Sequence, residues 1–140
     1  MQLTKNFTYE EFYASDTALK KNINNTPPTS AVVNIVRLAD NCMQKIRNHF
    51  GVAVIITSGY RCPRLNSAVG GAAKSQHTTG EACDFVVKGV SIEKVIAWCR
   101  GNLEFDQLIN EKGQWVHISF SNTKNRREVL KFDGKNYSKI

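Results

Sequence analysis

No apolar run in this sequence approaches the roughly 20 residues that a helix needs to cross a bilayer. The first twelve residues, MQLTKNFTYEEF, also lack the apolar core of a secretory signal. We therefore expect a protein that is made in the cytoplasm and does not insert into a membrane. If it acts outside the cytoplasm, another route must deliver it.

No two of the four cysteines form a C-x-x-C pair, which excludes the commonest zinc-ribbon and redox motifs. Without a secretory signal, we expect Cys42, Cys62, Cys83 and Cys99 to be reduced thiols that pack as small hydrophobic side chains. A cysteine hydrolase using Cys62 or Cys83 with a histidine is disfavoured, because no known local signature surrounds either residue.

Acidic residues are the minority, with 12 Asp and Glu against 19 Lys and Arg, a formal net charge of +7. Such a protein is attracted to polyanions, whether nucleic acid, anionic lipid or anionic cell wall. The basic residues are scattered apart from a C-terminal cluster of Lys124, Arg126, Arg127 and Lys131. Because no recognition-helix or zinc-finger spacing accompanies them, we predict no nucleic-acid partner.

The 140 residues contain no repeat or low-complexity segment, and we expect one domain over 1–140. Periodicity predicts helices over 8–13, from about Ser30 to Phe50, and from Ser91 to about Arg100. Strands are expected over 52–57, 82–87, 105–110, 115–120 and 128–132. Turn residues predict a loop over 16–28. The long segment 58–80, with one helical turn near 63–67, has the length of a functional loop.

Two histidines and one aspartate fall where a metal site needs ligands. His77 lies near the end of the long loop, Asp84 on the next predicted strand and His117 on another. Zinc accepts imidazole and carboxylate, and three protein ligands leave a fourth tetrahedral position for water. Strand alternation places His117 on the face opposite Val116 and Ile118. Each residue also has an ordinary structural alternative, so spacing alone leaves zinc as one hypothesis.

The segment Ser75-Gln76-His77-Thr78-Thr79-Gly80-Glu81-Ala82-Cys83-Asp84 has the pattern S-x-H-x-x-G-x-A-x-D. Together with Ser58-Gly59-Tyr60-Arg61, Phe105-Asp106-Gln107-Leu108-Ile109 and Trp115-Val116-His117, it resembles the zinc D-Ala-D-Ala carboxypeptidases and L-alanyl-D-glutamate endopeptidases. The resemblance covers nearly the whole chain and best fits small single-domain members from phages and prophages. It implies an α+β fold of the hedgehog/DD-peptidase type, a small antiparallel sheet flanked by helices with a zinc site on the sheet.

The same resemblance implies that His77, Asp84 and His117 hold Zn²⁺. Arg61 would stabilise negative charge developing on the substrate or bind a substrate carboxylate, a task that suits a planar guanidinium. The remaining implied site residues shape the metal loop or contact substrate: Ser75, Gln76 and Trp115.

The general base does not follow from the resemblance, because better-known relatives carry a glutamate where this sequence has Gln114. The nearest acid is Glu111. A two-residue loop, Lys112-Gly113, would pair Glu111 with Gln114 and turn it away from His117. A three-residue loop would pair it with Trp115 on the His117 face. We favour Glu111 as the base, with Asp106 as a second candidate.

The resemblance therefore implies a monomeric, endolysin-like zinc peptidase that hydrolyses peptidoglycan stem peptides at the cell wall or in the periplasm. Carboxypeptidase, dipeptidase and endopeptidase relatives share these motifs, so the bond that is cut stays open. The alternative, prompted by Gln114, is a catalytically impaired zinc-containing module that binds the cell wall.

Overall fold

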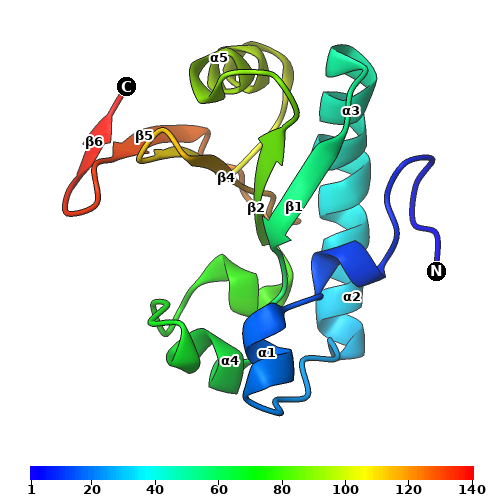
Figure 1. Ribbon diagram of the computed structural model, residues 1–140. Coiled ribbons are helices and arrows are strands. Elements are labelled where there is room, and N and C mark those ends of the chain that lie inside the picture. Colours follow the sequence, from blue (N-terminus) through cyan, green and yellow to red (C-terminus); the bar gives the residue numbers. More distant parts are fainter.

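The computed structural model describes residues 1–140 and has a mixed α+β architecture (Figure 1). The helical segments are η1 (Glu10–Phe12), α1 (Asp16–Lys20), α2 (Thr29–Leu38), η2 (Ala39–Met43), α3 (Gln44–Phe50), α4 (Pro63–Ala68), η3 (Gln76–Thr79) and α5 (Ile92–Asn102). The strands are β1 (Val54–Ser58), β2 (Ala82–Val87), β3 (Gln107–Glu111), β4 (Trp115–Ser119), β5 (Glu128–Phe132) and β6 (Tyr137–Lys139).

The strands form one six-stranded sheet in the order β1-β2-β4-β3-β5-β6. All neighbouring pairs are antiparallel except β3 and β5, so the expectation of an antiparallel sheet needs this one correction. The reason lies in the connection between β4 and β5. Because β4 ends beside the start of β3, a short connection brings the chain to Glu128 opposite Gln107, and β5 runs in the direction of β3.

The long helix predicted from Ser30 to Phe50 is confirmed in extent, as α2, η2 and α3 follow one another without a break. Its middle, Ala39–Met43, is a wider π-helical turn that the apolar spacing does not predict. The helix ends at Gly51, whose φ of 69° is the left-handed conformation common just after a helix.

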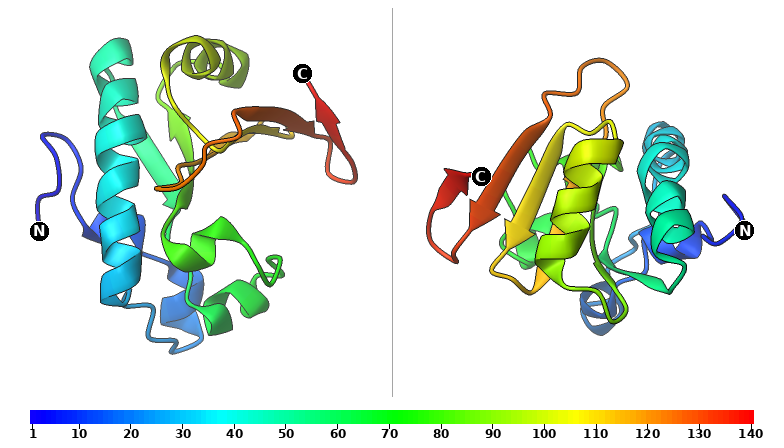
Figure 2. Two further views of the ribbon diagram at one scale, coloured as in Figure 1. Left: turned by 180° about the vertical axis from the view of Figure 1, so that it is seen from behind. Right: turned by 90° about the horizontal axis from the view of Figure 1, so that it is seen from above.

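The long helix and α5 cover one face of the sheet, as the views in Figure 2 show. Their apolar side chains and those of the strands make the core, in which Leu38, Met43, Val95, Phe85 and Ile118 are fully buried. Because the helices cover this face, the opposite face of the sheet is the one left to carry polar chemistry. None of the helices has the length and apolar character that crossing a bilayer requires.

The N-terminal segment departs most from the predictions. The helix expected over 8–13 shortens to η1, although the Thr8 amide donates to Glu11 at 3.0 Å as a capping box requires. The prediction of a loop over 16–28 was wrong at its start, where α1 forms. Ser15 caps α1 by accepting from the Ala18 amide at 3.1 Å. Strand β6 was not predicted.

The candidate metal centre and its cleft

His77, Asp84 and His117 form one cluster, with ligand atoms that all lie within 4.8 Å of one another. Asp84 on β2 stands directly opposite His117 on β4, since the two strands are paired in this register. Oδ1 of Asp84 lies 3.0 Å from Nδ1 of His117 and 3.4 Å from Nε2 of His77. Three segments distant in sequence thus bring two imidazoles and one carboxylate together.

The ring of His77 is held from behind by the backbone. Nδ1 of His77 lies 2.7 Å from the carbonyl oxygen of Gly59, which is a pure acceptor, so Nδ1 carries the proton and donates. The lone pair of Nε2 is therefore free to bind a metal, and Nε2 faces Asp84. Such an outer hydrogen bond is the usual way in which a protein fixes a metal-binding histidine. Ser75 adds a cap, because its hydroxyl accepts from the His77 amide at 3.2 Å.

Gly59 has no room for a side chain. A Cβ at this position would lie 2.2 Å from the carbonyl oxygen of Phe12, closer than any real contact. The Tyr60 amide donates to that same carbonyl, at 2.6 Å. The N-terminal segment therefore packs directly against the backbone that positions His77.

The donor set fits zinc. Both histidines are buried, with 3% exposure for His77 and 9% for His117. Burial alone would raise the pKa of Asp84, but the neighbouring imidazoles of His117 and His77 hold it well below its usual value, so the carboxylate is ionised. Neutral imidazole nitrogens and an ionised carboxylate are what zinc binds. Cys83 is excluded as a fourth donor, since its thiol is buried on the other face at 3.4 Å from the Met43 sulfur.

The cluster lies in a cleft of about 610 Å³. One wall is the polar face of the sheet, and the other is formed by Arg61 and by residues between 69 and 76. The lining includes all eight site residues expected from the sequence: Arg61, Ser75, Gln76, His77, Asp84, Glu111, Trp115 and His117.

Glu111 faces the cleft because the β3–β4 hairpin has the three-residue loop. Glu111 is paired with Trp115, and the Gln114 amide donates to the Glu111 carbonyl at 2.9 Å. Lys112 and Gly113 have positive φ angles of 58° and 67°, and Gln114 is exposed. Burial raises the pKa of Glu111, with smaller opposing effects of His117, which lowers it, and Asp84, which raises it. An acid therefore lies near the cluster although Gln114 is not one.

Arg61 lies half-buried on the opposite wall. Its Nε is buried and has no hydrogen-bond partner, and no carboxylate forms an ion pair with the side chain. Burial lowers the pKa of Arg61, while the charge of Asp84 raises it. A guanidinium of this kind has hydrogen-bonding capacity left for a substrate oxygen.

Asp106 is not available as a base. Its two carboxylate oxygens accept from Nε and Nη2 of Arg126 at 2.8 and 3.0 Å, and Oδ2 also accepts from Gln76 at 2.9 Å. The Arg126 guanidinium holds the pKa of Asp106 below its usual value. Asp106 instead ties the segment before β5 to the turn that carries His77. The side-chain amide of Gln76 therefore donates to Asp106, while Gln76 still lines the cleft.

The cleft residues that the sequence analysis missed include Arg126, Phe132 and Tyr137. The first belongs to the basic C-terminal cluster, which had been considered only for its charge. The other two lie beyond the expected motifs, on β5 and β6. The alternation of Leu130, Lys131 and Phe132 was the only available signal, and it did not say which face meets the cleft.

A family model described as Peptidase M15 matches residues 5–119, a range that includes the whole cluster, Arg61 and Glu111. The chain belongs to the peptidase M15 family. M15 peptidases are zinc-dependent, which agrees with the donor set of the cluster. A comparison with curated proteins gave no significant match.

As an M15 peptidase, the protein is a zinc metallopeptidase that acts on a peptide substrate. The match ends at the last residue of β4. Strands β5 and β6 of this M15 peptidase lie outside the matched range. They supply Phe132 and Tyr137 to the cleft, and the connection before β5 supplies Arg126.

Proposed function

We propose that this M15 peptidase hydrolyses the stem peptides of peptidoglycan, as a D-Ala-D-Ala carboxypeptidase or an L-Ala-D-Glu endopeptidase, and that it acts at the cell wall or in the periplasm as a monomer. The observation that carries the proposal is the position of Glu111. It lies on the cleft face of β3, one strand from His117 and opposite Trp115. Its presence favours an enzyme over a zinc-containing wall-binding module, because the acid absent at position 114 is supplied at position 111.

His77, Asp84 and His117 would hold the zinc ion, which when bound supplies a water of lowered pKa and polarises the substrate carbonyl. Glu111 takes a proton from the attacking water on its carboxylate. It then passes that proton to the amine that leaves. The partly apolar surroundings of Glu111, which raise its pKa, suit a group that must both accept and return a proton.

Arg61 has a separate task on the opposite wall. Its guanidinium donates hydrogen bonds to the carbonyl oxygen as negative charge develops there, or to a carboxylate of the substrate. Its Nε is buried and unpartnered before substrate arrives, so no internal ion pair must break first. Ser75 supports the turn that carries His77, whereas Gln76 and Trp115 border the space in which substrate lies.

The net charge of +7 supports a wall substrate, since it attracts the protein to anionic murein and its attached acids. The first experiment measures zinc content and release of peptides from purified peptidoglycan, with and without a chelator. One zinc per chain and chelator-sensitive release are expected, and mass spectrometry of the products would name the bond. One zinc with no release from any wall type would contradict the proposal and favour the binding module.

A further inference from the structure

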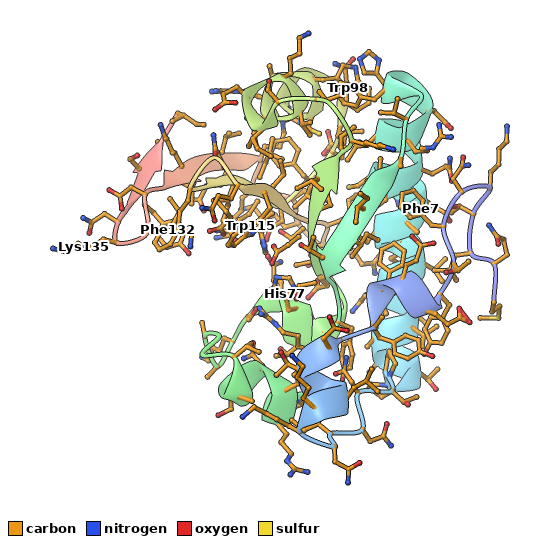
Figure 3. All side chains as sticks on the ribbon, viewed as in Figure 1. Phe7, His77, Trp98, Trp115, Phe132 and Lys135 are labelled. Carbon is orange, nitrogen blue, oxygen red and sulfur yellow. The ribbon has the colours of Figure 1, made fainter.

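Glu111 and three aromatic side chains form a row that crosses four strands. Trp115 on β4, Glu111 on β3, Phe132 on β5 and Tyr137 on β6 are successive cross-strand partners. Directly paired residues share a face of the sheet, so these four side chains, the aromatic row, all face the cleft that they line. Figure 3 shows Trp115 and Phe132 along the same side of the sheet, leading outward from His77.

The outer end of the aromatic row reaches solvent, with Phe132 partly buried and Tyr137 exposed. Phe132 and Tyr137 lie with ring centroids 4.5 Å apart and planes 32° from parallel, and Tyr137 is 57% exposed. The short strand that carries Tyr137 is exposed throughout. Large exposed rings that continue a ligand cleft are more typical of a binding surface than of packing. Tyr137 lines the same cleft as the metal cluster.

We propose that Phe132 and Tyr137 form a subsite for the sugar to which the stem peptide of the substrate is attached. This inference rests on the proposed function. A sugar ring has a flat face of C–H groups and a polar rim, and it matches a shallow aromatic surface with exposed polar neighbours. Lys135 and Asn136, in the turn before β6, supply such neighbours. The aromatic ring face is the electron-rich side that polarised C–H groups approach.

Other occupants fit this surface less well. An apolar side chain gains most from an enclosed pocket, whereas Tyr137 stays largely exposed. A group with one flat apolar face and a polar rim fits better, because one side of it can stay in water while the other packs on the ring of Tyr137.

The distance from the metal cluster suits a sugar carried on a short peptide. Strand β6 lies three strand spacings from β4, which is about 14 Å at ~4.8 Å each. An extended peptide covers that length in roughly four residues. A substrate that is cut about four residues from its sugar, as at a D-Ala-D-Ala bond, therefore reaches the subsite with its sugar while its scissile bond lies at the cluster. A cleft without β5 and β6 has no surface at this position.

The test compares two zinc-loaded variants, Tyr137→Ala, which removes the ring, and Tyr137→Phe, which keeps it. Ser138→Ala, on the other face of β6, is the control for changes to this strand. The substrates are a stem peptide bearing N-acetylmuramic acid, the free stem peptide and a peptide in which extra residues replace the sugar. We expect Tyr137→Ala to lower the ratio of kcat/KM for the sugar-bearing to the free peptide roughly tenfold, mainly through KM. Tyr137→Phe and Ser138→Ala should keep the wild-type ratio.

Two kinetic outcomes would overturn the inference. One is an unchanged ratio in Tyr137→Ala. The other is a loss that also affects the sugar-free extended peptide, which would make the subsite a peptide site. Calorimetry of the muramic-acid-containing disaccharide with the same proteins separates the two proposals. Tyr137-dependent binding without hydrolysis of any substrate would contradict the proposed function and leave the subsite standing. Hydrolysis with no sugar binding and no sugar preference would do the reverse.

Discussion

Glu111 and Trp115 face each other across the β3–β4 hairpin, and the three residues between them decide which acid enters the cleft. Had the loop been one residue shorter, the Glu111 side chain would point to the opposite face of the sheet. The turn geometry, rather than the identity of residue 114, therefore determines whether this chain carries an acid near its metal cluster.

The first prediction concerns that acid. Replacing Glu111 by glutamine should lower kcat by roughly 10²- to 10⁴-fold, the usual contribution of general acid–base catalysis, while zinc content stays at one per chain. Gln114→Ala is the matched control and should keep wild-type activity, because Gln114 is exposed in the turn. Steady-state kinetics and metal analysis of both proteins check this. A fully active Glu111→Gln enzyme would show that another group moves the proton.

The second prediction is that zinc is held by the cluster and stabilises the fold. Removing zinc with a chelator should abolish activity and lower the unfolding temperature, because the folded cluster binds the ion and the unfolded chain does not. Free zinc at a hundredfold excess over its Kd should add about 2.7 kcal/mol to the free energy of unfolding. His77→Ala should show no stabilisation by zinc in calorimetric scans with and without the ion. Zinc-dependent stabilisation that survives in His77→Ala would place the ion elsewhere.

The third prediction separates two glycines. Gly59→Ala should destabilise the fold by about 1–3 kcal/mol, since its Cβ meets the Phe12 carbonyl, and it should also weaken zinc binding, since the Gly59 carbonyl holds His77. Gly101→Ala, in α5 with nothing near its Cβ, should stabilise the fold by about 0.4–1 kcal/mol and leave zinc affinity unchanged. Denaturant titrations and zinc-competition assays give both quantities for each variant.

The fourth prediction uses the lowered pKa of Asp106. A carboxyl whose pKa is lower in the folded state stabilises the fold above its unfolded pKa, near 3.9, and loses that contribution as pH falls through the folded value. The stability difference between wild type and Asp106→Asn should therefore be largest at neutral pH and shrink below about pH 4. Denaturant unfolding of metal-free protein at pH 7 and pH 3 measures it. A difference that does not change with pH would contradict the assigned ion pair with Arg126.

Much of the fold was predictable wherever the apolar pattern is long or alternates cleanly. The bounds of β2 and β5 match the prediction, and β1, β3 and β4 shift by no more than two residues at either end. What failed depends on weaker local signals. Strand β6 has three exposed residues and no alternation with a core, and α1 has only five residues with one buried side chain.

The site was predictable to a similar degree, and for the same kind of reason. Strand alternation places His117 and Trp115 on one face whatever the rest of the chain does. The face of Glu111 depends on one residue of loop length, which the sequence left open and the pairing of Glu111 with Trp115 settles. The link of Asp106 with Gln76 and Arg126 joins three separate segments, and no local pattern indicates such a contact.

Strands β5 and β6 lie after the range matched by the family model. Strand β5 pairs on its inner side with β3, and β6 pairs only with β5. Neither strand supplies a member of the His77, Asp84 and His117 cluster. The outer side of the cleft is thus formed by residues outside the matched range, whereas the three cluster residues lie within it. Substitutions in β5 and β6 can therefore change the surface that borders the substrate space without altering a metal ligand.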